Sequence, residues 1–125
     1  MDILLNDIEA RVLGCLLEKS MTTPDYYPLS LVALTTACNQ KSSRNPVMSL
    51  EETTVVRALD SLKAKRLVVQ GASGRVPKYA ETFVSLNNLV ARESSLLMIM
   101  LLRGPQTIGE LRTRTERAYK FDSVE

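Results

Sequence analysis

The apolar positions near the N-terminus predict a helix over residues 7–19. They stand three or four residues apart, which is the spacing of one buried helix side: Leu5, Ile8, Val12, Cys15 and Leu16. Asn6 precedes this segment and Glu9 comes three residues later, a spacing that predicts a capping box at the helix N-terminus. Pro24 then breaks the pattern, and Thr23 before it predicts a single helical turn.

A second helix is predicted over residues 31–39, with Ser30 as its N-cap. Residues of this segment that share one helix side are Leu31, Leu34, Thr35 and Cys38. The polar run over residues 39–45 cannot bury much surface, so we expect a surface connection there. Its first two residues, Asn39 and Gln40, either close the preceding helix by bonding its last carbonyls or serve a function that the sequence does not specify.

Residues 49–66 are predicted to form a third helix, because Ser49 and Glu52 have the spacing of a capping box. Its buried stripe consists of Val55, Leu59 and Leu62. The period then becomes that of extended chain, with short strands over residues 67–70 and 75–79 and a glycine-containing turn between them. Three helices followed by a hairpin are typical of a winged-helix domain, here residues 1–82, which is mainly α with a small β-hairpin as the wing.

A second unit is predicted over residues 83–125. Its strongly apolar helix covers residues 89–103, Gly104 stops it, and Thr107 with Glu110 predicts the capped start of a further helix. The segments 9–19 and 93–103 resemble each other weakly, so the unit is interpreted as the first helices of a second, incomplete winged helix. Its apolar helix must then pack on the first domain, on another copy of the chain, or on residues beyond this sequence.

Composition is that of a globular protein, with 45% hydrophobic and 24% charged residues. The sequence has no apolar run long enough for a membrane span, and its start lacks the basic region of a signal peptide, so we expect a cytoplasmic protein. The net charge of +2 is unevenly spread, at −3 over residues 1–40, +4 over residues 41–82 and +1 over residues 83–125. Such a local excess of positive charge favours a polyanionic partner.

Enzymatic and metal-binding functions have little support in the sequence. Histidine is absent, which removes the commonest general base and metal ligand. Cys15 and Cys38 lie in apolar stretches and are interpreted as free buried thiols. The glycines at 71 and 74 are not followed by a lysine-bearing helix, as a phosphate-binding loop would require. We therefore expect a protein without catalytic residues, cofactor or metal.

Several motifs distributed over nearly the whole chain carry a family resemblance: Leu13–Lys19, Thr22–Pro24, Tyr27–Ser30, Ala37–Lys41, Arg44, Pro46–Met48, Arg75–Val76, Lys78–Tyr79, Leu101–Gly104, Gln106–Thr107, Gly109–Arg112 and Arg114. In these motifs the chain resembles the YceH family of bacterial proteins. The resemblance implies two tandem winged-helix domains, of which this chain would lack the end of the second. It departs from the family at Val90–Glu93, where the family opens its fourth helix with a serine and alanines. The resemblance supports the fold and leaves the function open.

Duplex DNA is the partner that we expect for this fold. The third helix of a winged helix usually enters the major groove, and the wing contacts the backbone. Candidate nucleic-acid-binding residues come from the connection before that helix, its outer side and the wing: Lys41, Ser42, Ser43, Arg44, Thr53, Thr54, Arg57, Ser61, Arg75 and Lys78. Glu51 and Glu52 oppose such binding, although acidic side chains also suit a helix N-terminus.

The sequence thus predicts a non-catalytic winged-helix protein that binds duplex DNA as a homodimer, with a role in transcriptional regulation. The alternative is a protein-interaction adaptor that uses the same fold without nucleic acid. For that alternative, the apolar helix of the second unit supplies the docking surface, and Leu97 and Leu101 are its test positions.

Overall fold

The computed structural model describes residues 4–73 and 75–103 of the 125-residue chain. Its elements in chain order are α1 (Asp7–Thr22), η1 (Pro24–Tyr26), α2 (Leu31–Cys38), α3 (Glu52–Ala64), β1 (Val68–Ser73), β2 (Val76–Glu81), α4 (Phe83–Leu86) and α5 (Ala91–Arg103). The order of three helices and a hairpin is that of a winged helix, as the sequence predicts. The helix expected from Thr107 lies outside the described residues.

The starts of the first two helices are as predicted. Asn6 and Glu9 form the capping box of α1, in which each side chain accepts a hydrogen bond from the backbone N–H of the other residue. The hydroxyl of Ser30 accepts a hydrogen bond from the N–H of Ala33 and caps α2. Thr23 precedes the short turn η1. These elements follow from local sequence because both partners of each cap lie within three residues.

The predicted start of the third helix is wrong. The helix begins at Glu52 with Glu51 as its N-cap residue, and Ser49 forms no cap. The reason is a contact across 11 residues: the Asn39 side chain accepts from the N–H of Leu50 at 2.7 Å and donates to the Leu50 carbonyl at 2.9 Å. Because Leu50 is bonded to α2 in this way, the chain can turn into a helix only after it.

The wing is longer than predicted. Strands β1 and β2 pair antiparallel from Val68 opposite Glu81 to Ser73 opposite Val76. On the other side of β2, Leu29 and Tyr79 exchange backbone hydrogen bonds, which attaches the segment before α2 to the hairpin. Strand β2 is therefore held on both sides, by β1 and by the segment before α2.

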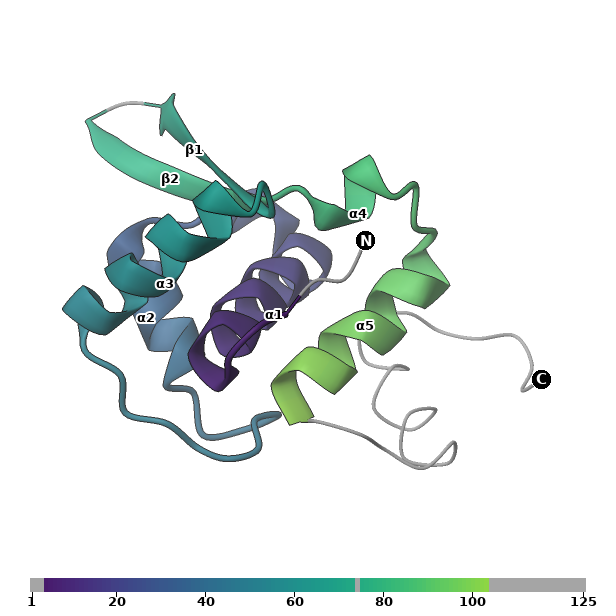
Figure 1. The fold of residues 1–125 in the computed structure, drawn as a ribbon, viewed down its shortest axis with the longest axis horizontal. Helices are drawn as coiled ribbons and strands as arrows, with labels where there is room; N and C mark the ends of the chain where they lie inside the picture. Colours follow the sequence, from purple (N-terminus) through teal and green to yellow (C-terminus); the bar gives the residue numbers. More distant parts are fainter. Residues whose placement is uncertain (1–3, 74, 104–125) are drawn as a thin grey trace.

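Helix α1 lies at the centre of the molecule, with α2 and α3 on one side and α5 on the other (Figure 1). The core is one continuous cluster that includes Leu16 of α1, Leu34 of α2 and Leu59 of α3, together with Met98 and Leu102 of α5. The sequence left three possible packing partners open for the apolar helix of residues 89–103. In the structure this helix, α5, packs on α1 of the preceding helices. No helix within the described ranges is long and apolar enough to cross a membrane.

Gly14 allows α1 and α5 to approach closely. A Cβ atom at this position would lie 2.8 Å from Cδ2 of Leu102 and 3.0 Å from Cβ of Leu101. Glycine is unfavourable inside a helix by about 1 kcal/mol relative to alanine, so its presence here is explained by packing. The two segments that resemble each other in sequence, 9–19 and 93–103, are thus packed on one another.

Candidate nucleic-acid interface

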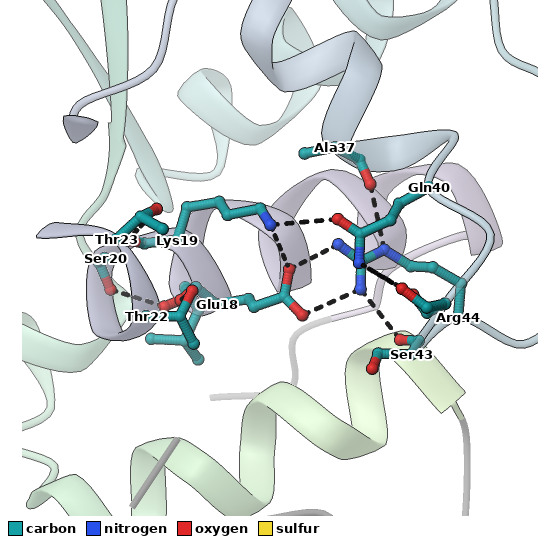
Figure 2. A network of polar contacts seen from close by, with 11 residues as sticks. Glu18, Lys19, Ser20, Thr22, Thr23, Ala37, Gln40, Ser43 and Arg44 are labelled. Atoms are coloured by element: carbon teal, nitrogen blue, oxygen red, sulfur yellow. Dashed lines mark hydrogen bonds and ion pairs between the residues drawn. The ribbon is translucent and has the colours of Figure 1, made fainter. Parts of the chain in front are cut away.

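The connection between α2 and α3 is held by buried side chains. Arg44 is its central residue, because its side chain has no exposed surface and makes a two-point ion pair with the Glu18 carboxylate of α1 (Figure 2). Its Nε donates to the Ala37 carbonyl at 3.1 Å, and Nη1 also donates to the carbonyl of Ser43. Because the guanidinium is bonded inside the protein, the predicted surface position of Arg44 is wrong.

Arg11 holds the same connection from the other end. Its Nη1 donates to the Cys38 carbonyl at 2.9 Å, and its Nη2 donates to the carbonyl of Pro46. The side chain is 2% exposed, and burial lowers its pKa. Together with Arg44 and Asn39, it holds the connection before α3, and the Asn39 side chain bonds Leu50 rather than the last carbonyls of α2.

Lys19 and Gln40 close the outer edge of this network. The Lys19 ammonium donates to Oε1 of Gln40 at 3.1 Å and lies 3.3 Å from the Glu18 carboxylate (Figure 2). The Gln40 amide in turn donates to the carbonyl of Ser42. The result is a rigid loop, on which Lys41 and Ser42 are exposed and Ser43 is half-buried with a φ of 58°.

The outward side of α3 is a stripe of four exposed residues, Thr53, Arg57, Asp60 and Ala64. Thr53 and Arg57 lie where the sequence predicts them, at spacings that keep all four residues on one helix side. Thr54 is half-buried next to this stripe. Arg57 is therefore the cation that α3 presents to solvent at its middle.

Ser61 is half-buried at the edge of this stripe and its hydroxyl is bonded to α1, so its predicted surface role is wrong. Its hydroxyl donates to the Glu9 carboxylate of α1 at 2.6 Å, and Lys65 donates to the same oxygen at 2.7 Å. Burial raises the pKa of Glu9, but the bonds from Asn6, Lys65 and Ser61 outweigh it and lower that pKa from 4.5 to about 2. This carboxylate therefore stays charged and ties α3 to α1.

The internal ion pairs reduce the positive charge that the sequence suggests. Of the eight basic residues in segment 41–82, Arg44 and Lys65 are paired with carboxylates of α1. A further one, Lys63, lies 3.3 Å from Asp60. Part of the charge gradient along the sequence is thus internal to the fold rather than available to a partner.

Arg75 is exposed in the turn immediately before β2. Lys78 is half-buried and pairs with Gly71 of β1. Successive residues of a strand point to opposite faces, and Tyr79 faces α3, because its ring lies 5.9 Å from the Lys63 ammonium. Lys78 therefore points to the other face of the wing, away from α3, and does not share a surface with Arg57.

Lys63 is not among the residues that the sequence predicts for the interface. In the structure it lies in the angle between α3 and the wing, where it donates to Oε1 of Gln70 at 3.0 Å and lies over Tyr79. The position of Lys63, six residues after Arg57, does not predict these contacts with Gln70 and Tyr79. They depend on how the hairpin folds back on α3.

The chain matches the family model described as "Protein of unknown function, DUF480" over residues 5–125. The chain belongs to this family. The DUF480 chain is 60% identical over 122 residues to a UPF0502 protein of Geobacter sulfurreducens, which covers 97% of this chain and 56% of that protein. It is 61% identical over 125 residues to a UPF0502 protein of Geotalea uraniireducens, which covers 99% of this chain and 57% of the relative. The DUF480 chain thus spans a little over half the length of these relatives.

Proposed function

We propose that this protein binds duplex DNA without catalysing a reaction, through the outward side of α3 and the wing. The observation that carries the proposal is the exposed Arg57 at the middle of the third helix of a winged helix. Helix α5 packs on α1, on the side away from α3, so the outward side of α3 is not covered by it (Figure 1). In this fold the third helix is the usual element in the major groove.

Three exposed cations would make the main contacts. Arg57 would reach a guanine edge or a phosphate in the groove, and Arg75 on the wing would contact a neighbouring phosphate. Lys41, on the loop that the buried arginines hold rigid, would contact the backbone next to the N-terminus of α3. A loop that is already ordered loses little conformational freedom on binding, which favours such a contact.

Charge sets a limit on the expected affinity. Glu51 and Glu52 are exposed at the N-terminus of α3, the end that approaches DNA in most proteins of this fold. With about three phosphate contacts, the logarithm of affinity would fall with the logarithm of salt concentration with a slope of about −2.7. We therefore propose that duplex DNA binds this part of the protein with modest affinity, and that the affinity depends strongly on salt concentration.

The test is fluorescence anisotropy with a labelled random-sequence duplex at low and at near-physiological salt. The variants are Arg57→Ala and Arg75→Ala, and the control is Arg92→Ala, which removes the same charge from an exposed position on α5. Binding that weakens in the first two variants and not in the control supports the proposal. No binding of the folded protein at low salt, or an equal loss in all three variants, contradicts it.

An adaptor role has less support from the packing of α5. Leu97 and Leu101, its proposed docking residues, pack against the core, and Met98 and Leu102 are buried. The exposed apolar side chains of this region are Leu86, Val90 and Met100. A protein partner would therefore have to bind these scattered residues, which form a weaker docking surface than a whole apolar helix.

The greater length of the relatives is consistent with a second unit. We propose that residues from Phe83 onward begin a second winged helix, as the resemblance to the YceH family implies, and that α5 joins this unit to the first domain. The homodimer and the role in transcriptional regulation also remain proposals, which size-exclusion chromatography and a search for a specific binding site would test.

A further inference from the structure

Two free thiols lie inside the core, where neither the fold nor the proposed DNA contact uses them. Cys15 is in the middle of α1 and Cys38 is the last residue of α2, and both side chains have no exposed surface. They come from different helices that are 23 residues apart in the sequence. Packing alone would accept an apolar side chain such as alanine or valine at either position.

The neighbours of Cys15 place it directly against the end of α2. Arg11, Cys15 and Glu18 follow one side of α1 at spacings of four and three residues. On one flank, Arg11 donates to the carbonyl of Cys38 itself at 2.9 Å. On the other flank, Glu18 binds Arg44, which donates to the carbonyl of Ala37. Cys15 lies between these two contacts, which places its buried side chain against the end of α2 that carries Cys38.

The charges around this pair favour a thiolate at Cys15. Arg11 donates to backbone carbonyls and forms no ion pair with a carboxylate among the described residues, and its Nε is buried without a hydrogen-bond partner there. The neighbouring Cys38 thiol lowers the pKa of Cys15 despite burial, and Arg44 and Arg11 lower it further while Glu18 opposes them. The neighbouring Cys15 thiol and burial raise the pKa of Cys38, so Cys38 keeps its proton.

We propose that Cys15 and Cys38 form an oxidation site, at which hydrogen peroxide converts the two thiols into an intramolecular disulfide between α1 and α2. The Cys15 thiolate attacks one peroxide oxygen, the O–O bond breaks, and the hydroxide that leaves takes up a proton as water. The Cys38 sulfur then attacks the sulfenic acid of Cys15, its proton leaves with the hydroxyl group as a second water, and the S–S bond forms. The two thiols together lose two electrons, and one hydrogen peroxide molecule gains these electrons and becomes two waters.

Burial determines which oxidant reaches the pair. Hydrogen peroxide is small and uncharged, so a local opening of the core admits it more readily than it admits a bulky alkylating reagent. The two buried guanidiniums also disfavour a metal cation at the same sulfurs, since like charges repel in a medium of low dielectric constant. The site is thus selective for a small neutral oxidant.

The new bond would act where the loop before α3 is anchored. Cys38 precedes Asn39, which bonds to Leu50, and the Cys38 carbonyl accepts from Arg11. A covalent link from α1 to this point restricts the base of the loop in the oxidised protein. The proposal stands on the core alone and does not depend on the proposed DNA binding.

The experiment treats the native chain with hydrogen peroxide, removes the oxidant with catalase, unfolds the protein and labels remaining thiols with N-ethylmaleimide. Peptide mapping by mass spectrometry then identifies each cysteine. The expected result is a Cys15–Cys38 linked peptide that a reductant releases, while untreated native protein reacts slowly with the maleimide. The variant Cys38→Ala is expected to lose the link and to accumulate oxidised Cys15, and circular dichroism checks that it folds.

If the Cys38→Ala variant does not fold, the experiment on the wild-type protein is sufficient to test the proposed disulfide. Unmodified thiols after a treatment that fully oxidises free glutathione would overturn the proposal. So would links between molecules in place of the internal link, or sulfinic acid on either cysteine without a disulfide.

Discussion

Arg44 and Glu18 are 26 residues apart in the sequence and form a two-point ion pair in which the arginine side chain is fully enclosed. The pair joins the connection before α3 to the central helix α1. A carboxylate and a guanidinium buried together are stable only while both are present, since each needs the other to compensate for lost hydration. The loop that precedes α3 therefore depends on a residue of the first helix.

Substitution Arg44→Met should destabilise the protein by about 3–5 kcal/mol, because it leaves the Glu18 carboxylate buried without its partner. Urea denaturation measures the change. The exposed neighbour gives a matched control, since Lys41→Ala should change the stability by less than about 0.5 kcal/mol.

The double variant Glu18→Met with Arg44→Met tests the same pair independently. Removing both charges should recover much of the stability lost in Arg44→Met, as expected for two groups that interact directly. Additive losses from the two positions would contradict the pairing.

Glu9 should give the protein a measurable acid dependence. Its pKa in the folded protein is lowered to about 2 from the usual 4.5, so the charged carboxylate favours the folded state above that range. This contribution is lost as the pH falls from about 4.5 toward about 2. Glu9→Gln keeps a side chain able to complete the capping box and should flatten the stability curve over this range, as followed by urea denaturation at each pH. An unchanged slope would show that Glu9 does not carry the effect.

Gly14→Ala tests the close approach of α1 and α5. Alanine favours a helix over glycine by about 1 kcal/mol, but its Cβ would meet Leu102 at 2.8 Å. We expect net destabilisation and faster amide hydrogen exchange in α5. Gly71→Ala is the control, because nothing lies within 4 Å of its added Cβ atom. Equal effects of the two substitutions would argue against the packing of α5 on Gly14.

The loop before α3 also makes Asn39 a testable residue. Asn39→Ala removes both hydrogen bonds to the Leu50 backbone and leaves half-buried polar groups without these partners, which should cost about 1–3 kcal/mol. Amide exchange at the start of α3 should rise more than exchange at its end. Uniform exchange along α3 in the variant would mean that Asn39 does not set where the helix begins.

Local signals in the sequence predicted the parts of the fold whose partners are close along the chain. The capping box of Asn6 and Glu9, the Ser30 cap and the hairpin after the third helix all belong to this class. The start of α3 was not predicted correctly. Asn39, at the end of α2, forms hydrogen bonds with Leu50, and this contact outweighs the Ser49 capping pattern.

The candidate interface was predictable only in part for the same reason. Arg57 and Arg75 are exposed as expected, since neither forms an ion pair with another residue of the described ranges 4–73 and 75–103. Arg44 and Ser61 have the same residue types as surface contacts, but their partners, Glu18 and Glu9, lie in α1. A sequence does not reveal such pairs until the helices are placed side by side.

The salt dependence of binding to duplex DNA tests the central claim most directly. Anisotropy titrations of the wild-type protein at several salt concentrations should give an affinity that falls steeply with salt, and Arg75→Ala should reduce the slope by about one phosphate contact. Arg92→Ala should leave the slope unchanged. Binding that does not depend on salt, or a slope that Arg75→Ala and Arg57→Ala both leave as it was, would contradict the DNA contact through α3 and the wing.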